Sequence, residues 1–345
     1  MKYTGYIEGY YGKLLSWDER HQIIDHLFKN DLNTFFYCPK EDPFHRSHWK
    51  EPYPESWMSS FTNFINHANK NSIKIIFGIS PGLEYNNSFK NLSDKIESVI
   101  HLGVKDISIL FDDLFEDQSA ELHADILNEC SRHFNDTNFY CVPAEYCNQL
   151  SKPNFDDSKY LENLSLLLNA DIPIFWTGSK VVSANYTSDD ISKWRDKLKH
   201  PLIVWDNFYA NDYCTPKVII DDYSSLKEIN LDALEGVLIN PMGLLELDKI
   251  ALSSFSNSLK NHPKSFEDIL EESDLPSSFH KVSKLFRFRA SIDLNQSELE
   301  VLESYLWNWH GNLKSELYPY MHLLRLMIKE GTSDQTILKR FNLKS

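Results

Sequence analysis

Two adjacent carboxylates, Asp112 and Asp113, are the side chains of this sequence best suited to acid–base chemistry. They directly follow residues 108–111, an apolar run that is typical of a buried strand. Two like charges at the end of such a strand repel each other, a setting in which one carboxyl group keeps a proton that it can donate near neutral pH. The alternative is an acidic loop in which one Asp caps the next helix and the other is solvated. The elements around the pair decide between these interpretations.

Eight short β-rich runs alternate with helical patterns between residue 4 and about residue 258. The runs are 5–9, 34–38, 73–79, 106–111, 139–142, 172–176, 202–205 and 237–239. Parallel strands need crossovers between them, and no hairpin turn joins these runs directly. The alternation therefore predicts an α/β fold, a (β/α)8 TIM barrel over residues 1–258. An open doubly wound sheet is the alternative, although eight strand–helix units would be unusually many for such a sheet.

The segments between the runs are amphipathic. Ser16 and Glu19 form a capping box that opens one helix, and residues 89–100 carry a second helical pattern. The faces predicted to be buried are Ile23, Ile24, Leu27 and Phe28 in the first helix, and Leu92, Ile96 and Val99 in the second.

The alternation of strands and helices stops after residue 258. Residues 259–345 show helical periodicity without a strand signal, and we expect a helical C-terminal domain there. Its apolar and aromatic residues are most simply explained by packing on the barrel or on one another. The alternative is a partner-binding face, which includes a homodimer formed through these helices.

The composition limits the classes of partner. A formal net charge of −15 over 345 residues argues against nucleic acid, which proteins bind through clusters of Lys and Arg. No apolar run approaches the roughly 20 residues of a membrane helix, and the start of the chain carries no hydrophobic signal segment. We therefore expect a cytoplasmic protein that does not bind membranes, with export by a route without a cleavable signal left open.

Cysteine and histidine spacing gives no sign of a metal. The five cysteines include no C-x-x-C pair, and the thirteen histidines have no ligand spacing, so neither a disulfide framework nor a metal site is predicted. The glycines form no phosphate-binding loop, which leaves a nucleotide cofactor without support. We predict no metal and no cofactor.

Polar, aromatic and glycine residues follow the ends of the predicted strands. In a (β/α)8 barrel the carboxyl ends of all strands meet on one face, which carries the active site. Aromatic walls with Asp, Asn and Lys side chains suit a pyranose, which offers apolar C–H faces and a rim of hydroxyl groups. The residues expected on this face are Gly9, Lys40, Asp112, Asp113, Tyr146, Trp176, Trp205, Asn207, Asp212 and Asn240. In this setting the carboxylate pair favours catalysis over a solvated loop.

The adjacency of the two carboxylates bears on the mechanism. Most glycosidases place two carboxylates about 5 Å apart for retention or about 6.5–9.5 Å apart for inversion, on different strands. Neighbouring residues at a strand end start in opposite directions, so one can reach under the sugar while the other reaches the glycosidic oxygen. If neither is a nucleophile, the substrate's own 2-acetamido oxygen can attack the anomeric carbon.

Eight short motifs together identify a family that the chain resembles. They are EGYYG at 8–12, PKEDP at 39–43, SPG at 80–82, FDD at 111–113, PAEYC at 143–147, WTG at 176–178, WDN at 205–207 and NP at 240–241. In this order they resemble family 84 glycoside hydrolases, the group of protein O-GlcNAcases and related β-N-acetylglucosaminidases, some of them once described as hyaluronidases. One departure is the segment 12–17, which lacks the proline that the family often has there.

The resemblance implies a role for each residue. Asp112 would orient the acetamido group, and Asp113 would be the general acid and base. Tyr146 and Asn207 would hold the acetamido group or the cyclised intermediate. The remaining residues divide into those that would bind sugar hydroxyls, Gly9, Lys40, Asp212 and Asn240, and those that would shape the pocket, Trp176 and Trp205.

The resemblance also implies an activity. We expect a retaining exo-β-N-acetylglucosaminidase that removes O-linked GlcNAc from Ser or Thr of proteins through an oxazoline-type intermediate. A GlcNAc-bearing glycoprotein or glycan would be the substrate. Two alternatives stay open, an enzyme acting on free oligosaccharides or amino-sugar polymers and a catalytically silent sugar-binding or scaffold protein.

Overall fold

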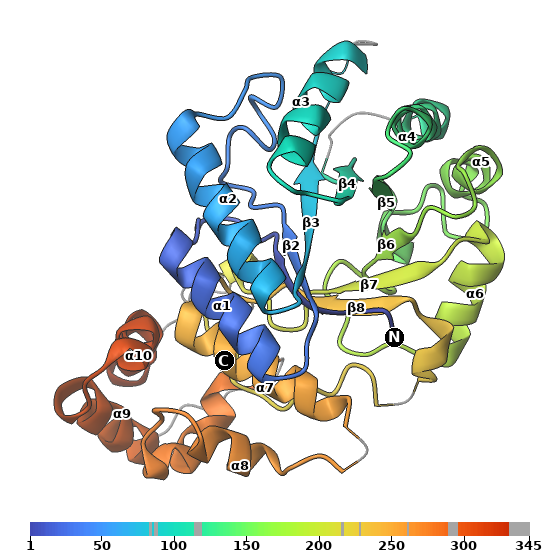
Figure 1. Cartoon of the computed structure of the whole chain (residues 1–345). Helices are drawn as coiled ribbons and strands as arrows, with labels where there is room; N and C mark the ends of the chain where they lie inside the picture. The colour runs from blue at the N-terminus through green and yellow to red at the C-terminus, as the bar shows by residue number, and fades with distance from the viewer. Residues whose placement is uncertain are drawn as a thin grey trace. The chain divides into compact units, whose positions relative to one another are not determined.

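A closed barrel of parallel strands forms the centre of the fold. A computed structural model of the chain describes residues 1–82, 85, 89–113, 119–214, 217–227, 229–260, 262–288 and 296–330. Within these ranges eight strands pair in sequence order, and β8 returns to pair with β1 (Figure 1). They are β1 (Tyr3–Glu8), β2 (Thr34–Tyr37), β3 (Lys74–Ile79), β4 (Asp106–Leu110), β5 (Asn138–Val142), β6 (Ile174–Trp176), β7 (Leu202–Asp206) and β8 (Gly236–Ile239). The predicted (β/α)8 barrel is confirmed.

Helices follow most of the strands. After β1 to β6 come α1 (Trp17–Lys29), α2 (Glu55–Lys70), α3 (Phe89–His101), α4 (Ala120–His133), α5 (Lys159–Leu167) and α6 (Ser188–Leu198), and Figure 1 shows these helices outside the strands. Helix α7 (Leu245–Ser258) follows β8. After β7 the described residues form the short 3-10 turns η3 (Asp212–Cys214) and η4 (Leu231–Ala233), so the seventh unit departs from the predicted strand–helix alternation.

The inward side of the barrel is filled by every second residue of the strands. The interior residues include Ile7, Cys38, Leu110, Trp205 and Leu238, each at the carboxyl end of its strand or directly after it. Side chains alternate between the two faces of a strand, so the residue two positions further along points to the same side. Those next inward positions are Gly9, Lys40, Asp112, Asn207 and Asn240, all of which the sequence placed in the site.

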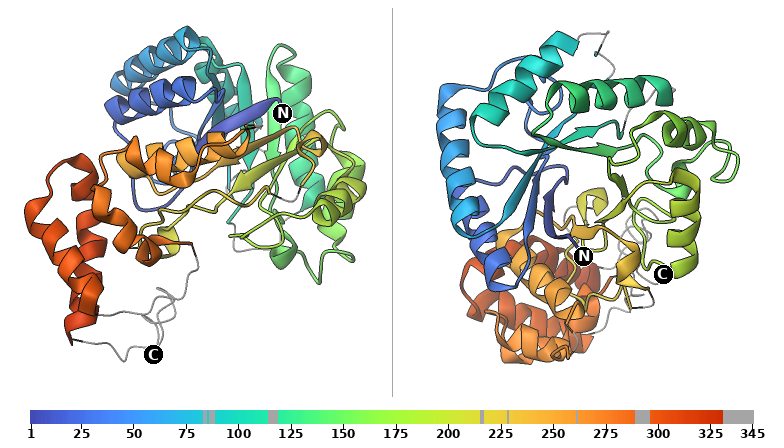
Figure 2. Two further views of the ribbon diagram at one scale, coloured as in Figure 1. Left: turned by 90° about the horizontal axis from the view of Figure 1, so that it is seen from below. Right: turned by 45° about the vertical axis from the view of Figure 1, so that its right-hand side comes forward.

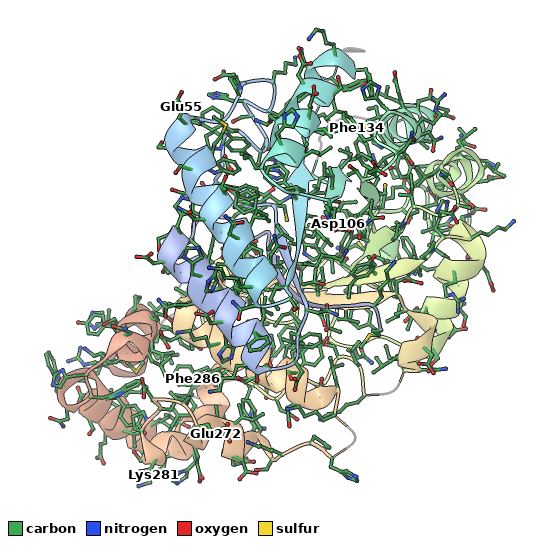
Figure 3. The ribbon with its side chains drawn as sticks, in the orientation of Figure 1. Glu55, Asp106, Phe134, Glu272, Lys281 and Phe286 are labelled. Atoms are coloured by element: carbon green, nitrogen blue, oxygen red, sulfur yellow. The ribbon has the colours of Figure 1, made fainter. Side chains whose placement is uncertain are left out.

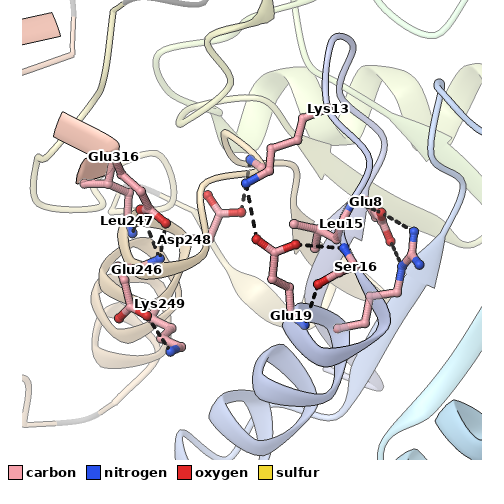
Figure 4. Close-up of polar contacts among 12 residues, drawn as sticks. Glu8, Lys13, Leu15, Ser16, Glu19, Glu246, Leu247, Asp248, Lys249 and Glu316 are labelled. Atoms are coloured by element: carbon pink, nitrogen blue, oxygen red, sulfur yellow. Dashed lines mark hydrogen bonds and ion pairs between the residues drawn. The ribbon is translucent and has the colours of Figure 1, made fainter. Parts of the chain in front are cut away.

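Helix α1 shows both a confirmed and a wrong prediction. The capping box is present, because Ser16 Oγ accepts from the Glu19 N–H at 3.2 Å and Glu19 Oε2 accepts from the Ser16 N–H at 2.7 Å (Figure 4). Leu27 is fully buried as predicted, but Phe28 is 59% exposed and does not belong to the buried face. The buried stripe instead begins at Arg20, at i, i+3, i+4 and i+7 spacing, and Phe28 lies one residue beyond it.

Arg20 is buried because it has a partner at the end of β1. Its Nε and Nη2 atoms donate to the two carboxylate oxygens of Glu8, each at 2.8 Å (Figure 4). A buried charge requires such a paired and hydrogen-bonded neighbour. The pattern of α1 alone could not reveal this partner. In α3 the predicted face, Leu92, Ile96 and Val99, is confirmed as buried.

The opposite end of the barrel has its own polar network. Asp106, at the start of β4 in Figure 3, accepts from the Tyr140 hydroxyl at 2.7 Å and from Asn138 Nδ2 at 3.0 Å. Lys74 Nζ lies 2.9 Å from the same carboxylate. These bonds satisfy a buried carboxylate at the amino ends of three neighbouring strands, far along the barrel from Asp112 and Asp113.

The described chain divides into two compact units. The first comprises residues 1–208 and 224–240, and the second comprises residues 209–223 and 241–345 in so far as they are described. The second unit contains α7, α8 (Phe266–Glu271), α9 (Gln296–Asn308) and α10 (Asn312–Glu330), and α9 and α10, red in Figure 2, lie side by side. Glu316 of α10 accepts from the backbone N–H groups of Glu246 and Leu247 at the start of α7 (Figure 4). The predicted domain boundary after residue 258 stays a prediction. The final residues of the predicted C-terminal domain, 331–345, lie outside the described ranges.

Across the parts of the chain that the structure describes, no helix combines the length and apolar character needed to span a bilayer.

The burial of α1 makes a prediction for two neighbouring residues. Replacing Leu27 by Ala should lower the free energy of unfolding by about 2–5 kcal/mol, because it leaves a cavity in a packed core. Replacing Phe28 by Ala should change it by less than about 0.5 kcal/mol, because the ring is mostly in water. Urea unfolding of the two variants measures the difference, and equal losses would show that Phe28 is part of the core after all.

Candidate active site

The backbone turns sharply between the two carboxylates. Strand pairing continues just past β4, because the Phe111 N–H donates to the Val142 carbonyl at 2.9 Å. Asp113 then adopts a φ of +58°, in the left-handed region that few residues other than Gly, Asn and Asp enter. In an extended strand, adjacent side chains would point to opposite faces. The turn instead brings both carboxylates toward Lys40.

Lys40 is the cation of the site. Its side chain is 3% exposed, its Nζ forms an ion pair with Asp112 Oδ2, and it lies 3.8 Å from Asp113 Oδ2. Burial alone would lower the pKa of the Lys40 ammonium, but the negative charges of Asp112 and Asp113 outweigh burial and raise that pKa above its usual value. Lys40 therefore stays charged and balances the carboxylates.

The two carboxylates have different surroundings. Asp112 is buried, and its Oδ1 has no hydrogen-bond partner among the described residues. The side chain of Asp113 is 32% exposed, and both of its oxygens accept hydrogen bonds, from the Tyr11 hydroxyl at 2.6 Å and from the Tyr146 hydroxyl at 3.1 Å. A buried acceptor without a partner costs free energy unless a ligand supplies the donor. Asp112 is therefore suited to accept from a ligand N–H or O–H.

Both tyrosines keep their protons at neutral pH. Burial raises the pKa of Tyr11 to about 12, with a further contribution from its hydrogen bond to Asp113. Burial and the charge of Asp113 raise the pKa of Tyr146 well above its usual value. Arg46 Nη1 donates to the Tyr11 hydroxyl at 2.9 Å, so this hydroxyl must direct its own proton to Asp113.

A hydrogen-bonded chain joins β1, β7 and β8 on the other side of the site. Asn207 Oδ1 accepts from Trp205 Nε1 at 3.0 Å and from Asn240 Nδ2 at 2.9 Å, and Asn207 Nδ2 donates to the Val181 carbonyl at 2.7 Å. The Gly9 N–H donates to Asn240 Oδ1 at 3.1 Å. A Cβ atom on Gly9 would lie 2.4 Å from the Trp205 ring, so only glycine fits this close approach.

Lys40 links the two sides of the site. Its Nζ lies 5.9 Å from the Trp205 ring centroid and 5.8 Å from the Tyr11 ring centroid. A cation over aromatic faces is stabilised by the ring quadrupole. The groups that the structure brings together are thus Gly9, Lys40, Asp112, Asp113, Tyr146, Trp205, Asn207 and Asn240.

The structure does not bring Trp176 to this cluster. Trp176 is fully buried, and its ring centroid lies 5.5 Å from those of Tyr186 and of Trp194 on α6. It follows the inward-facing Phe175 in β6, so its ring points to the helix layer instead of the barrel interior. Asp212 begins η3 in the second compact unit, and its predicted role in binding stays a prediction.

Sequence reasoning did not assign a role to Tyr11 or Arg46. Tyr11 follows Gly9 by two residues in the EGYYG motif, and this spacing was the available signal. Arg46 lies in the long irregular segment between β2 and α2, where periodicity carries no information. In the described ranges no group of three or more His, Cys, Asp or Glu side chains is arranged to hold a metal ion. The five cysteines are buried thiols.

Comparisons with known proteins show the family to which the chain belongs. Residues 4–283 match the family model described as beta-N-acetylglucosaminidase. Over 275 residues the chain is 30% identical to the Protein O-GlcNAcase of Mus musculus and to that of Rattus norvegicus, covering 75% of this chain and 30% of each relative. A solved structure of a mutant O-GlcNAc hydrolase from Thermobaculum terrenum is similar with a TM-score of 0.79 and 26% identity, covering 95% of this chain and 82% of the other.

These findings define a class and then a family. The barrel with paired carboxylates at the carboxyl ends of its strands places the chain among the glycoside hydrolases. Within them it belongs to the beta-N-acetylglucosaminidase family, family 84, which its motifs predicted. The alignment covers about 30% of the length of the two mammalian relatives.

The position of Lys40 makes a prediction about stability. Replacing Lys40 by Met should lower the free energy of unfolding at pH 7 by about 3–5 kcal/mol, because it leaves the buried Asp112 carboxylate without a counter-charge. Lys90→Met is the matched control, because Lys90 pairs with Asp94 on the surface of α3 with its side chain 83% exposed. The control should change the free energy of unfolding by about 0–1 kcal/mol. Similar losses in the two variants, measured by urea unfolding, would contradict the ion pair.

Proposed function

We propose that this chain is a retaining exo-β-N-acetylglucosaminidase that removes O-linked GlcNAc from Ser or Thr of proteins by substrate-assisted catalysis. The observation that carries the proposal is the unequal setting of two adjacent carboxylates. Asp112 is buried and ion-paired through one oxygen, and its other oxygen has no hydrogen-bond partner among the described residues. Asp113 is more exposed and is held by two tyrosine hydroxyls.

The first step needs an acceptor for the amide N–H of the substrate. Asp112 Oδ1 accepts this N–H, which increases the nucleophilicity of the amide oxygen. That oxygen bonds to the anomeric carbon while the bond from this carbon to the glycosidic oxygen breaks. In the form of the enzyme that carries a proton on Asp113, this residue gives the proton to the departing oxygen, so a neutral hydroxyl leaves. The product is a cyclic oxazolinium-type intermediate in the same pocket, and its N–H stays hydrogen-bonded to Asp112 Oδ1.

The second step reverses the roles. Water attacks the anomeric carbon, Asp113 takes a proton from that water, and the bond to the amide oxygen breaks. Each step inverts the configuration at the anomeric carbon, so the complete reaction retains it. The acetamido group and the cyclic intermediate are held by Tyr146 and Asn207. Sugar hydroxyls are bound by Gly9, Lys40, Asp212 and Asn240. The pocket is shaped by Trp205 and Trp176. The direct contacts of Lys40 and Tyr146 with the carboxylates, and the hydrogen bonds that join Gly9, Asn207 and Asn240, support the assignment.

The protein-linked substrate is inferred from the relatives. The mouse and rat relatives are both described as Protein O-GlcNAcase, and the Thermobaculum terrenum structure is described as an O-GlcNAc hydrolase. A cytoplasmic location suits a glycoprotein substrate of this kind. A homodimer formed through the C-terminal helices belongs to the same proposal, and size-exclusion chromatography with light scattering tests it.

Substitution of each carboxylate should have a different signature. Asp113→Asn should reduce kcat/KM by about 10²–10⁴-fold for a substrate with a poor leaving group and far less for an activated aryl β-GlcNAc, because only the former needs a proton. Asp112→Asn should reduce both by similar factors, because both substrates depend on the same amide oxygen as the nucleophile. The wild type measured beside both variants decides, and equal behaviour of the two variants would refute the division of roles.

The choice of sugar tests the nucleophile. An aryl β-glucoside, which has no acetamido group, should turn over at least about 10³-fold more slowly than the matching aryl β-GlcNAc, because the attacking oxygen is missing. The two glycosides share one leaving group, so the ratio reports the acetamido group alone. Efficient cleavage of the glucoside would exclude the substrate-assisted route. No turnover of either, with GlcNAc still bound, would favour a sugar-binding protein.

Glycoprotein and free glycan substrates can be separated directly. An O-GlcNAc-modified protein and chitobiose offered at equal concentration should give faster release of GlcNAc from the protein. Preference for chitobiose would favour the alternative of an enzyme for free oligosaccharides.

A further inference from the structure

A histidine on α4 packs directly behind the catalytic carboxylates. The rings of His123 and Phe111 are stacked with centroids 3.7 Å apart and an interplanar angle of 5°. Phe111 is the residue before Asp112, and both Phe111 and His123 are almost completely buried. Such close parallel stacking limits how far Phe111, and therefore the start of the Asp112–Asp113 turn, can move.

The same histidine is bonded to a tyrosine on α5. His123 Nδ1 lies 2.8 Å from the Tyr160 hydroxyl, and this hydroxyl accepts from the Ala144 N–H at 3.0 Å. A Tyr160 hydroxyl that accepts from Ala144 still has its own proton to donate, and His123 Nδ1 can accept it. Burial lowers the pKa of His123 to about 3, so the imidazole is neutral at working pH and can accept at Nδ1.

Tyr160 is itself fixed by the first turn of α5. Ser158 caps this helix by accepting from the Leu161 N–H at 3.0 Å, and its hydroxyl donates to Glu145 Oε2 at 2.5 Å. The backbone of Ala144 and the side chain of Glu145 are therefore both tied to α5. The next residue is Tyr146, whose hydroxyl donates to Asp113 Oδ1 at 3.1 Å.

These contacts connect the segment after β4 to the segment after β5 through residues of helices α4 and α5. We propose that His123 and Tyr160 are positioning residues that fix the Tyr146 loop after β5 against the Asp112–Asp113 turn after β4, and so set the hydrogen bond from Tyr146 to Asp113. The inference rests on the proposed function for its kinetic consequence. The contacts described for the two residues reach the site through Phe111 and Ala144. An error of about 1 Å at a reacting group can cost about 10²-fold in rate, so such indirect support is measurable.

The experiment removes one hydroxyl from the full chain. Tyr160→Phe keeps the ring but removes the acceptor for Ala144 and the donor for His123. The expected result is a loss of about tenfold in kcat for a GlcNAc substrate with a poor leaving group, and of less than about twofold for an activated aryl β-GlcNAc, because the change acts on the acid Asp113. KM should stay within about twofold of the wild type. Equal losses on both substrates, or no loss, would overturn the proposal.

Tyr320→Phe is the matched control. Tyr320 is fully buried on α10, and its hydroxyl donates to the Leu285 carbonyl at 2.7 Å in the second compact unit. It reports the effect of losing one buried hydroxyl whose described bond lies within the second compact unit. The ratio of the two substrate activities should be unchanged in this variant.

A double variant tests the route of the effect. If Tyr160 acts through Tyr146, then Tyr160→Phe should add less than about twofold to the loss already caused by Tyr146→Phe, instead of its full factor. Full multiplication of the two losses would show that the residues act independently and would overturn this route.

A second pair of variants covers the case in which Tyr160→Phe does not fold. His123→Phe keeps an aromatic ring on Phe111 but has no acceptor for Tyr160, whereas His123→Asn retains an oxygen near the position of Nδ1. The selective loss should occur in His123→Phe and be largely rescued in His123→Asn. The reverse order would contradict the hydrogen-bonded role.

A structural readout separates this inference from the proposed function. In a crystal structure of Tyr160→Phe or His123→Phe, the distance from Tyr146 Oη to Asp113 Oδ1 should increase beyond about 3.5 Å, the limit of a direct hydrogen bond. An unchanged distance of 3.1 Å would overturn the inference even if the wild type cleaved no GlcNAc substrate. If this distance increases in the variant but the wild type cleaves no GlcNAc substrate, the inference stands and only the proposed function is refuted.

Discussion

The charge balance between Lys40 and two adjacent carboxylates is the interaction on which the rest of the site depends. Two carboxylates on neighbouring residues at the end of an apolar strand would repel each other, and burial would increase the cost. The buried ammonium of Lys40 offsets both effects, and the carboxylates in turn keep it charged. One oxygen of Asp112 can therefore stay buried without a partner, which makes it a strong acceptor for a ligand donor.

The barrel supplies these groups through a simple geometric rule. Side chains alternate along each strand, so the residue that follows the last interior side chain by two positions faces the interior as well. This rule brings Gly9, Lys40, Asp112, Asn207 and Asn240 from five strands to one place. The left-handed turn at Asp113 breaks the rule once, and that exception allows both carboxylates to meet the same lysine.

The helix layer contributes more than cover for the barrel. Glu8 and Arg20 tie β1 to α1, while His123 and Tyr160 tie the ends of β4 and β5 to α4 and α5. In each case a helix residue forms a hydrogen bond with a polar group next to the site. Arg20 bonds to the Glu8 carboxylate, and Tyr160 bonds to the Ala144 N–H.

The sequence by itself determined the barrel, because strand runs, helix caps and βα alternation are local patterns that a parallel closed sheet requires. It also determined which residues stand at the strand ends and which family they resemble. Only the tertiary structure decided how those residues are used. Arg20 joins the buried stripe of α1 because it pairs with Glu8, and Phe28 lies outside that stripe. Trp176 faces the helix layer because its neighbour Phe175 faces inward, and Tyr11, in the segment after β1, reaches Asp113 from 102 residues away in sequence. Such partners are distant along the chain, and no local periodicity encodes their meeting.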